Sequence, residues 1–425
     1  MNMFEPVLTQ NVQRADSEKI ATYLAHGGYA ATRQALTGLT PGELVEMVKQ
    51  SGLRGRGGAG FPAGVKWGFM PKDPGTPKIV AVNADEGEPG TFKDRLIIEC
   101  DPHQLLEGTI IASYAVGANQ AYVYIRGEFY LGYQRLVQAI AEAYEHGYLG
   151  KNILDSGFDL DVSVQRGAGA YICGEETAML ESMEGKPGNP RLKPPYPAQT
   201  GLFGLPTLVQ NVETLACIPH IVLRGAEWFA SMGTEESKGP KIFSVSGHVN
   251  RPGNYELPLG TKLSEIIYEH AGGIRGGKQL KAVIPGGAST PVLTPEQVDI
   301  PMAFETLAKA GSALGTGAIV VMDESTCMVE AARRTAKFFA HESCGRCTPC
   351  RIGSMRLYEA LERLERGAGL QDDIERALYL SDNIDARTFC PMGAALVNPA
   401  RSTIQKFRPE FEHHLEHREC LVRLH

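Results

Sequence analysis

The first half of the chain alternates between short apolar runs and longer stretches whose apolar residues recur at helical spacing. Three short runs predict strands, at residues 78–83, 121–125 and 160–164. Two helical stretches lie between them, at residues 105–117 and 136–146. Because a chain that alternates strand and helix forms a parallel sheet covered by helices, this pattern predicts an α/β fold across about residues 60–230.

The pattern changes near residue 239. The next elements read as two strands, a helix and a third strand, at residues 241–245, 253–257, 263–271 and 281–284. Such a short mixed run predicts a small α+β module. From Met328 onward the apolar residues recur at helical spacing instead. The chain is therefore predicted to contain an N-terminal segment with the α/β domain, the α+β module and a helical domain, over residues 1–238, 239–326 and 327–425.

Composition narrows the possible functions. The 425 residues carry a net charge of −7, which argues against a nucleic-acid partner, because a phosphate backbone attracts a basic surface. No stretch approaches the roughly 20 apolar residues of a membrane helix, and the best candidate, residues 105–125, contains Glu107 and Asn119. No secretory signal is visible, and nine cysteines in so long a chain do not make a disulfide scaffold. We therefore expect a cytoplasmic protein with reduced thiols.

The cysteines of the helical part carry the strongest chemical signal. Cys344, Cys347 and Cys350 are spaced as Cys-x2-Cys-x2-Cys, and Cys390 is followed by a proline. Three thiolates on one tight loop, with a fourth from elsewhere in the fold, predict the ligands of a 4Fe-4S cluster. Zinc also binds four thiolates, but its sites usually pair two separated knuckles. We expect the first three cysteines in a loop between helices and the fourth in a later turn.

Glycine-rich segments indicate places where the backbone approaches a ligand closely. Residues 55–60 match G-x-G-x-x-G, yet a helix rather than a strand is predicted before them, so the Rossmann fingerprint fails on context. Backbone N–H groups together with Arg56 and Lys66 would still favour an anion. Flat apolar faces would come from three aromatic residues, Phe61, Trp67 and Phe69. A plain glycine-rich turn whose aromatic residues lie in the core is the alternative.

Two further segments indicate ligand contacts. Residues 83–90 follow the first predicted strand, at the edge where ligands bind in α/β sheets. Their carboxylates would bind sugar hydroxyls, a metal or only water. Residues 167–177 lead into a helix predicted to begin near Gly174, whose N-terminal N–H groups would face an anion. Taken alone, Glu175 and Glu176 in that first turn are better explained as partners of the helix dipole.

These segments together resemble one family over the whole chain. The resemblance is carried by residues 53–62, by the block Asn83-Ala84-Asp85-Glu86, by residues 169–178 and by the cysteine motif. Their order is similar to that of the NADH-binding, FMN-bearing iron–sulfur subunit of the proton-pumping NADH:quinone oxidoreductase, respiratory complex I. The resemblance implies an α/β Rossmann-like FMN/NADH domain, then a ubiquitin-like β-grasp (α+β) module, then an all-α iron–sulfur helical bundle.

By matching position, the resemblance also implies the site residues. FMN would be bound by Gly55, Gly57, Lys66, Asn83, Asp85, Tyr171, Gly174, Glu175, Glu176, Asn211 and Thr214. NADH would stack on the flavin and contact Phe61, Lys66, Phe69, Glu88, Glu175, Lys193 and Tyr196. One 4Fe-4S cluster would be bound by Cys344, Cys347, Cys350 and Cys390. Glu175 would position the hydride transfer, and no residue would act as a general acid or base. Gly87 and Gln210 depart from the family pattern, so no side-chain contact is carried over to them.

The implied function is electron input to a respiratory chain. A hydride would pass from NADH to FMN, and single electrons would pass to the cluster and on to clusters in partner subunits. The implied partners are a thioredoxin-like 2Fe-2S subunit and a large multi-cluster iron–sulfur subunit, in a complex at the cytoplasmic membrane that this chain does not itself span. The diaphorase subunit of an NAD-linked hydrogenase or formate dehydrogenase is the alternative enzyme. A non-catalytic zinc- or ligand-binding module is the alternative from another class.

Overall fold

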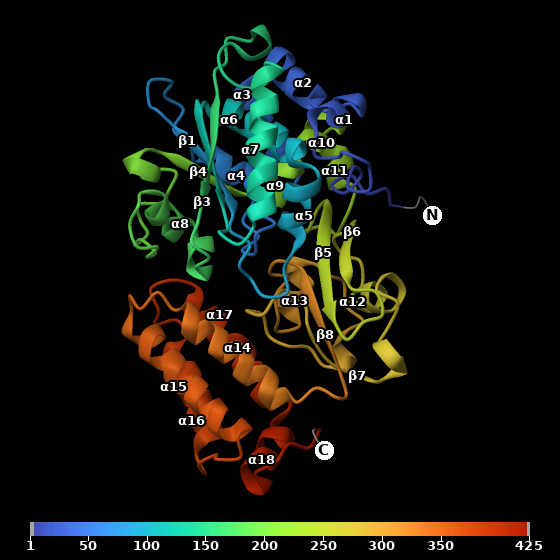
Figure 1. Ribbon diagram of the computed structural model, residues 1–425, viewed down its shortest axis with the longest axis vertical. Helices are drawn as coiled ribbons and strands as arrows, with labels where there is room; N and C mark the ends of the chain where they lie inside the picture. The colour runs from blue at the N-terminus through green and yellow to red at the C-terminus, as the bar shows by residue number, and fades with distance from the viewer. Residues whose placement is uncertain (1–3, 423–425) are drawn as a thin grey trace. The chain divides into compact units, whose positions relative to one another are not determined.

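The structure is a computed structural model that describes residues 4–422 (Figure 1). The described residues form two compact units. The first unit runs to Gly87 and also contains Phe92–Phe243 and Glu256–Gly260. The second unit contains Glu88–Thr91, Ser244–Tyr255 and the chain from Thr261 onward. Both units are therefore assembled from segments that are distant in the sequence.

The sheet of the first unit is parallel throughout. Its strands are β1 (Ile79–Ala84), β2 (Gln120–Ile125), β3 (Asp161–Arg166) and β4 (Thr207–Asn211). The strand order is β3-β2-β1-β4, so the chain returns to the other side of β1 to form β4. The predicted parallel α/β sheet and its three predicted strands are confirmed, and β4 is an addition that the apolar pattern did not predict.

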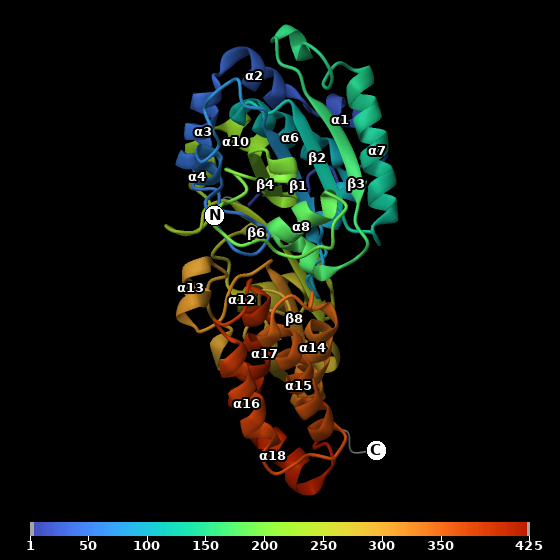
Figure 2. The ribbon, with the colours of Figure 1, turned by 90° about the vertical axis from the view of Figure 1, so that its left-hand side faces the viewer.

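The direction of the crossovers decides which face each helix covers. The connections that lead from β1 to β3 contain α5 (Lys93–Cys100), α6 (Pro102–Val116) and α7 (Tyr130–Glu145). The return from β3 to β4 contains α8 (Glu176–Met183). Because crossovers between parallel strands are right-handed, a reversal of direction moves the helix to the opposite face. Figures 1 and 2 show α6 and α7 on one face of the sheet and α8 on the other.

Helix α6 explains the longest apolar stretch of the sequence. All of its residues except Tyr114 are buried. Near its middle, Glu107 accepts hydrogen bonds from the backbone N–H groups of Tyr29 (3.0 Å) and Thr32 (2.9 Å) and from the hydroxyl of Tyr23 (2.5 Å). Burial raises the pKa of Glu107. The stretch is thus a core helix, and no helix within residues 4–422 is long and apolar enough to cross a membrane.

Short helices complete the first unit around this core. They are α1 (Ile20–Ala25), α2 (Ala30–Gly38), α3 (Pro41–Gln50), α4 (Ala63–Gly68), α9 (Val212–Ala216), α10 (Ile218–Arg224) and α11 (Ala226–Ala230). Helix α3 begins with a capping box, in which the Thr40 hydroxyl accepts from the Glu43 N–H and the Glu43 carboxylate accepts from the Thr40 N–H (2.8 Å). The glycine-rich segment at residues 55–60, here called the glycine loop, begins five residues after the end of α3.

The sheet associated with the second unit mixes both strand directions. Its strands are β5 (Pro240–Gly247), β6 (Gly253–Pro258), β7 (Leu280–Ile284) and β8 (Ala318–Asp323), in the order β6-β5-β8-β7. Strand β5 is parallel to β8, and β7 is antiparallel to it. The predicted strands of the α+β module are found, but β8 at its centre was not predicted. The predicted helix at 263–271 is a short α12 (Leu263–Glu265) that continues as a π-helical turn, Ile266–His270. A further helix, α13 (Phe304–Lys309), was also not predicted.

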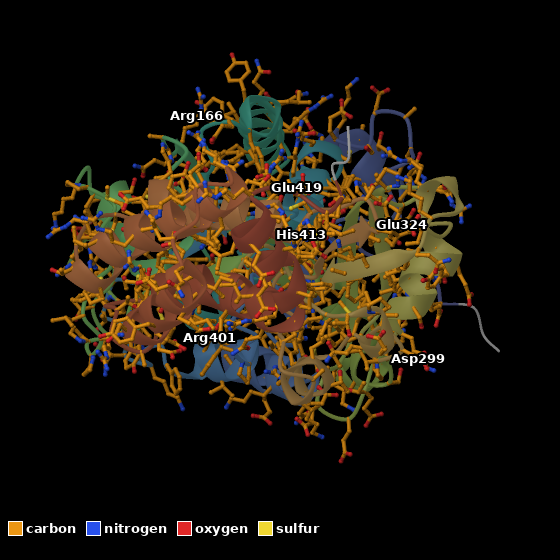
Figure 3. All side chains as sticks on the ribbon, turned by 90° about the horizontal axis from the view of Figure 1, so that it is seen from below. Arg166, Asp299, Glu324, Arg401, His413 and Glu419 are labelled. Carbon is orange, nitrogen blue, oxygen red and sulfur yellow. The ribbon has the colours of Figure 1, made fainter. Side chains whose placement is uncertain are left out.

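The remainder of the second unit is helical, as predicted. Its helices are α14 (Met328–Glu342), α15 (Thr348–Glu365), α16 (Asp373–Ile384), α17 (Met392–Lys406) and α18 (Arg408–His417). Helix α14 packs against both α15 and α17. Arg401 of α17, labelled in Figure 3, pairs with Asp382 and Asp385 of the α16 segment at 3.1 and 3.0 Å. These helices present the predicted cluster cysteines.

Candidate functional site

The strand order of the first unit creates a natural ligand site between β1 and β4. The chain leaves β1 in one direction and returns to form β4 on its other side, so the two following connections diverge. In open α/β sheets, ligands bind at this switch point, outside the carboxyl ends of the strands. Asn83 and Asn211 are register partners at those ends. Two predicted FMN residues therefore lie side by side at the expected edge.

The glycine loop lies against the end of β4. The backbone N–H of Arg56 donates to the hydroxyl of Thr214 (2.9 Å), and a Cβ added to Gly57 would lie 3.1 Å from the Asn211 side chain. Asn211 also caps α9, because its side chain accepts from the Thr214 N–H (3.3 Å). Absence of a side chain at Gly57 is what lets the loop approach the strand end so closely.

Arg56 does not serve the anion-binding role that the sequence suggested. Its side chain is buried, and the guanidinium donates to the backbone carbonyl oxygens of Arg54 (3.1 Å), Lys238 (2.7 Å) and Pro240 (3.0 Å). Burial lowers the pKa of Arg56. The guanidinium therefore holds the glycine loop from behind, and the expectation of a second free cation beside Lys66 is wrong.

The open side of the glycine loop still suits an anion. Gly58 has φ of 136°, and a Cβ added there would meet nothing within 4 Å. Among residues 4–422, no hydrogen bond engages the backbone N–H groups of Gly57 or Gly58. Successive N–H groups that are free of partners form a concavity that attracts phosphate-like groups. The loop therefore fits the phosphate end of a nucleotide.

The start of α8 meets the end of β1. Asn83 Nδ2 donates to the Gly174 carbonyl oxygen (2.8 Å), and a Cβ on Gly174 would lie 3.3 Å from the Asp85 carbonyl oxygen. The helix begins after a 3-10 turn, Tyr171–Gly174, and its N-cap is Glu175. These contacts place Gly174, and with it the start of α8, against Asn83 and Asp85 at the end of β1.

The N-terminus of α8 is not free, in contrast to the sequence expectation. The Glu175 carboxylate accepts from the N–H groups of Thr177 and Ala178, both at 2.9 Å, and from the Thr177 hydroxyl. A carboxylate at this position satisfies donors that an external anion would otherwise bind. Glu175 therefore has the capping role that its position alone suggests, through one carboxylate oxygen.

Four charged side chains meet beside α8. Lys66 of α4 donates to Glu176 (2.7 Å), and Lys193 donates to Glu175 (2.8 Å) and Glu176 (3.0 Å). Burial would raise the pKa of Glu176, but the two ammonium groups outweigh it and hold that pKa below its usual value. Burial would lower the pKa of Lys193, but the two carboxylates raise it. These ion pairs join α4, the start of α8 and the loop that carries Lys193.

Aromatic side chains near this charge group divide into exposed and buried ones. Phe61 and Phe69 are 48% and 59% exposed, with ring centroids 6.1 Å apart and planes tilted by 43°. Tyr196 is 54% exposed. Trp67 is buried, so it belongs to the core rather than to a ligand surface, in contrast to the expectation that it offers a free face. The exposed rings can accept a flat apolar group such as a nucleotide base.

The carboxylates that follow β1 are not a solvated loop. Asp85 and Glu86 are both buried. Glu86 accepts from the N–H groups of Lys93 (3.0 Å), Asp94 (2.8 Å) and Arg95 (3.1 Å), which begin α5. Burial, aided by the Asp94 carboxylate, raises the pKa of Glu86 to about 7. Glu86 therefore stabilises a helix start, whereas Asp85 remains a candidate ligand residue.

A buried network of charges supports this edge and was not among the predicted site residues. Asn211 Nδ2 donates to Asp94 Oδ2 (2.6 Å). Lys93 pairs with Asp94 (2.7 Å) and Glu213 (3.0 Å), and Lys241 pairs with Glu213 (3.0 Å). A sequence signal existed, since Glu213 lies two residues after the strand end at Asn211 and Lys93 opens α5. The sequence did not show that Lys93 and Glu213 pair with each other.

Glu88, the remaining predicted NADH residue, lies in the second unit. Its carboxylate accepts from the Ser289 N–H (2.6 Å), and a Cβ on Gly287 would lie 2.6 Å from its side chain. The residue before Glu88, Gly87, differs from the residue that the family pattern has at this position. A Cβ on Gly87 would lie 3.0 Å from Arg126 Nη1 and 3.3 Å from the Tyr171 ring. The chain at Gly87 therefore has little room for a larger residue.

The cysteine motif lies where α14 ends and α15 begins. Cys344 and Cys347 are in the connecting loop, where Gly345 has φ of 77°, as a tight turn there requires. Cys350 lies in the first turn of α15, not in the loop that the sequence predicted, because the chain becomes helical after Cys347 and Pro349 suits a first helical turn. Burial raises the pKa of the Cys350 thiol, and the nearby Cys347 and Cys344 raise it further.

The residue that precedes Cys390 contacts the cysteine loop. The Arg346 guanidinium lies 4.2 Å from the ring centroid of Phe389, the residue before Cys390. Cys390 immediately precedes Pro391 and α17, as expected of a later turn between helices. Arg351 Nη1 donates to the Gly345 carbonyl oxygen (3.0 Å) and fixes the loop. A cysteine loop that carries Arg346 and leads into the N-terminus of α15 with Arg351 fits an anionic thiolate-bound cluster.

We expect the Glu176→Gln variant to be less stable than the parent chain at about pH 7 and to lose this difference as the pH falls. The pKa of Glu176 is lower in the folded chain than its ordinary value of 4.5, so the ionised carboxylate favours folding above that pH. The contribution disappears as protonation proceeds below it. Denaturant unfolding at several pH values measures the effect, with the exposed Glu235→Gln as control. If the stability difference between the two chains stayed the same at pH values well below 4.5, the ionised Glu176 carboxylate would not be its cause.

These two sites define a class of protein: a redox chain that binds a phosphate-bearing cofactor at a sheet edge and an iron–sulfur cluster among helices. Three protein-family models match segments of this chain. They are the Nuo51 FMN-binding domain over residues 48–220, the SLBB domain over 242–293 and the NADH-ubiquinone oxidoreductase-F iron–sulfur binding region over 330–414. The predicted cofactors, FMN and one 4Fe-4S cluster, are confirmed.

Similar proteins identify the family. The chain is 55% identical over 418 residues to the NADH-quinone oxidoreductase F 2 subunit of Rhizobium meliloti (strain 1021), covering 98% of this chain and 99% of that protein. It is 50% identical over 422 residues to the NADH-quinone oxidoreductase F subunit of Mycobacterium tuberculosis (strain ATCC 25618 / H37Rv), covering 98% and 94%. The chain belongs to the family of NADH-quinone oxidoreductase F subunits, as the sequence resemblance predicted.

A solved structure shares the fold. It is the NAD+-reducing NiFe hydrogenase in the H2-reduced state, 38% identical with a TM-score of 0.84. The likeness covers 93% of this chain but only 66% of the hydrogenase chain, which is therefore considerably longer. The air-oxidized state of the hydrogenase gives a TM-score of 0.82. The fold of this chain is thus shared by a part of the NAD+-reducing hydrogenase chain.

Proposed function

We propose that this chain is the electron-input subunit of a proton-pumping NADH:quinone oxidoreductase. In this function the chain orients NADH against FMN, so that a hydride leaves the nicotinamide, and passes the electrons singly through its 4Fe-4S cluster to partner subunits. FMN supplies the conversion of a two-electron transfer into one-electron transfers when it is bound. The observation that carries the proposal is the convergence of the glycine loop, the β1 and β4 ends and the start of α8 within the residues that the FMN-binding model matches.

Each part of the first site has a task in this proposal. The N–H groups of Gly57 and Gly58, with Lys66, would bind the phosphate of FMN. Asn83 and Asp85 would hold polar groups of its ribityl chain or ring at the end of β1. The remaining proposed FMN residues are Gly55, Tyr171, Gly174, Glu175, Glu176, Asn211 and Thr214. The contacts of Asn211 and Thr214 with the glycine loop support their inclusion.

NADH would occupy the exposed side of the same site. The rings of Phe61, Phe69 and Tyr196 are exposed and suit the adenine. Lys66 and Lys193 carry positive charge near them, and Glu175 would orient the nicotinamide end, where Glu88 is also proposed to contribute. Hydride transfer needs no proton from the protein, so the task of these residues is orientation and not acid–base catalysis. Electrons would leave through the cluster bound by Cys344, Cys347, Cys350 and Cys390.

The direct test is NADH oxidation by the full-length chain loaded with FMN, with ferricyanide as electron acceptor. We expect turnover to depend on FMN. We expect the Lys193→Ala variant to retain FMN but to raise the KM for NADH about 10-fold, which corresponds to about 1.4 kcal/mol of lost binding. Lys186→Ala is the matched control, because Lys186 is an exposed lysine whose partners are Glu181 and Glu184. A flavin-loaded chain that does not react with NADH would overturn the proposal.

The finer description of the fold belongs to the same proposal. The strand order β3-β2-β1-β4, with its switch between β1 and β4, supports a Rossmann-like FMN/NADH domain. The mixed sheet β6-β5-β8-β7 and the SLBB match support a β-grasp module. We place the domain boundaries at residues 1–238, 239–326 and 327–425. Limited proteolysis of the full-length chain tests them, since cleavage is expected near residues 238 and 326.

The names of the relatives, each a subunit, indicate a complex of several chains, and the particular partners are proposed here. They are a thioredoxin-like 2Fe-2S subunit and a large multi-cluster iron–sulfur subunit, in an arm on the cytoplasmic side of the membrane. The hydrogenase likeness favours a second candidate, the diaphorase subunit of an NAD-linked hydrogenase. Full-length relatives at 47–55% identity favour the quinone-linked complex. Identification of the chains that co-purify with this one distinguishes the two.

A further inference from the structure

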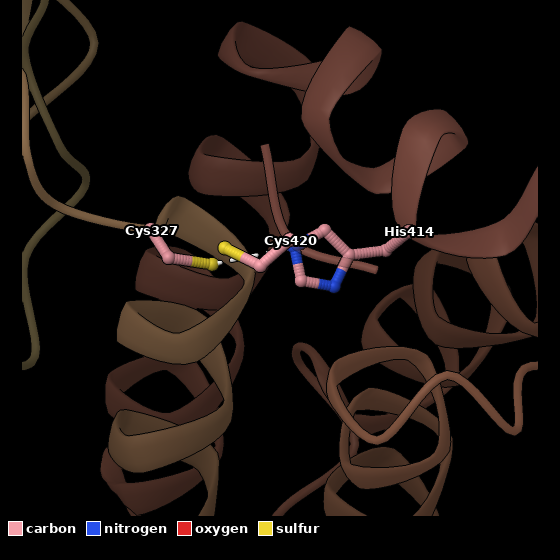
Figure 4. Close-up of side chains that lie close together, drawn as sticks. All are labelled: Cys327, His414 and Cys420. Atoms are coloured by element: carbon pink, nitrogen blue, oxygen red, sulfur yellow. Dashed lines mark hydrogen bonds between the residues drawn. The ribbon is translucent and has the colours of Figure 1, made fainter. Parts of the chain in front are cut away.

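Three potential metal ligands meet in the second unit, apart from the cluster motif. The ligand atoms of Cys327, His414 and Cys420 all lie within 4.8 Å of one another (Figure 4). Cys327 Sγ and His414 Nε2 are 3.4 Å apart. None of these residues belongs to the Cys-x2-Cys-x2-Cys motif or is Cys390. A Cys2His set, with Cys327 far in sequence from His414 and Cys420, is a donor set typical of zinc.

The fold brings these side chains together from different elements. Cys327 is the N-cap of α14, and its sulfur accepts from the Glu330 N–H (3.4 Å). His414 lies in α18 and is buried, and Cys420 lies beyond the end of α18 and is partly exposed. The N-terminus of a helix of 15 residues favours negative charge on the Cys327 sulfur. The site is thus sheltered on one side and open on the other, where an ion can enter.

Surrounding groups orient the imidazole toward the sulfurs. His414 Nδ1 lies 3.4 Å from the Leu364 carbonyl oxygen and 3.8 Å from the Glu365 carboxylate. A histidine whose Nδ1–H faces a carbonyl and a carboxylate presents Nε2 as the lone-pair donor, which is the usual arrangement around bound zinc. Nε2 is the ring nitrogen that faces Cys327 Sγ. The same Glu365 carboxylate lies 3.6 Å from that sulfur.

We propose that Cys327, His414 and Cys420 bind a zinc ion. In a tetrahedral site with Zn–S of about 2.3 Å and Zn–N of about 2.05 Å, the sulfur and nitrogen atoms are about 3.6 Å apart. The 3.4 Å between Cys327 Sγ and His414 Nε2 matches this spacing. The Glu365 carboxylate or a water molecule completes the coordination. The soft sulfur donors favour zinc over magnesium or calcium, which take oxygen ligands.

The alternative is that these thiols stay protonated and bind no ion. Burial raises the pKa of the Cys327 thiol, and the Glu365 carboxylate and Cys420 raise it further. A bound zinc ion reverses that preference, because it stabilises the thiolate that coordinates it. Sulfur is a weak hydrogen-bond partner, so hydrogen bonds among these three side chains would be weak. Coordination of one cation by the two sulfurs and the imidazole nitrogen accounts better for their close approach.

The proposed ion has a structural role. It ties the segment after α18 to the N-cap of α14, the helix whose other end leads into the cluster loop at Cys344. Removing it frees the chain beyond α18, while α14 and α15 keep their mutual packing. The site should therefore contribute to the stability of the helical part without contributing to the exchange of electrons.

Zinc analysis of the full-length protein tests the proposal. Protein produced with added zinc and purified without chelators should contain one zinc ion per chain, in addition to its iron. X-ray absorption at the zinc edge should report two sulfur ligands near about 2.3 Å and one nitrogen ligand near about 2.05 Å. In the Cys420→Ser variant the zinc should be lost while the iron content is unchanged.

The control is Cys100→Ser, because Cys100 ends α5 in the first unit and is also partly exposed. That variant should retain zinc. Since Cys420 lies outside every described helix, its replacement leaves the packing of the bundle in place. Protein without zinc, zinc that remains in Cys420→Ser, four sulfur ligands in the absorption spectrum, or a disulfide between Cys327 and Cys420 would each overturn the proposal.

Discussion

The Cys344→Ala variant is expected to lose its iron–sulfur cluster and keep its flavin. Cys344 is one of three closely spaced cysteines proposed as cluster ligands, and a cubane cluster needs a ligand at each corner. With one corner open, the cluster is exposed to solvent and falls apart. Iron per chain should drop from about four to fewer than about one. FMN should remain, because the residues proposed to bind it lie in the first unit and Cys344 lies in the second.

Activity measurements on Cys344→Ala distinguish the contribution of the flavin from that of the iron–sulfur cluster. NADH oxidation with ferricyanide should persist, because that acceptor can take electrons from the flavin. Electron delivery to partner subunits of the assembled complex should fall to background. Cys100→Ala is the matched control, since Cys100 lies on α5 and outside both proposed metal sites. Full iron content in Cys344→Ala would exclude Cys344 as a ligand.

The Glu213→Gln variant is expected to lower the free energy of unfolding by about 3–5 kcal/mol, the range observed when one partner of a buried ion pair is removed. Glu213 is completely buried between Lys93 and Lys241, each 3.0 Å away, and its other oxygen accepts from the Ile242 N–H (2.8 Å). An amide cannot balance two ammonium groups. Burial already lowers the pKa of Lys241 to about 8, and loss of Glu213 lowers it further.

This loss should reach the flavin site, because the network holds Asn211 through Asp94. We expect FMN to dissociate from Glu213→Gln at lower denaturant concentration than from the parent, alongside the drop in stability. Chemical unfolding followed by flavin fluorescence measures both quantities. The matched control is Glu227→Gln, an exposed residue of α11 without an ion pair among the described residues, which should change stability by no more than about 0.5 kcal/mol. Equal stability of Glu213→Gln and the control would show that the network is not needed.

Local patterns predicted many elements well. The segments at 78–83, 121–125 and 160–164 became β1, β2 and β3 within two residues. Buried parallel strands such as β1 favour continuous apolar sequence, whereas the edge strand β3 alternates. Strand β8 was missed although its residues, Ala318–Asp323, are equally apolar. Its place between β5 and β7 depends on pairing with strands distant in the sequence, and no local signal encodes that pairing.

In the candidate site, too, local motifs were predicted from the sequence, whereas contacts between distant residues were not. The glycine loop and the cysteine spacing were visible in the sequence, since a ligand that approaches the backbone needs glycine and a cubane needs three near thiolates. Arg56 and Trp67 were misassigned as ligand-facing, because the burial of a side chain depends on what packs over it. The start of α8 was expected to be free, but the carboxylate of Glu175 caps that helix. Lys93 and Glu213 went unnoticed for a related reason, because a charged residue in sequence does not reveal its partner.

The sequence by itself determined the chemistry of this protein: which residues can bind a nucleotide phosphate, and which thiols can ligate iron and sulfide. It did so because ligand type and spacing follow from covalent geometry over a few residues. Only the tertiary structure decided which side chains face the ligand and which brace the fold behind it. It also brought together Cys327, His414 and Cys420. Those outcomes depend on burial and on contacts between residues far apart in the sequence, which chain folding alone creates.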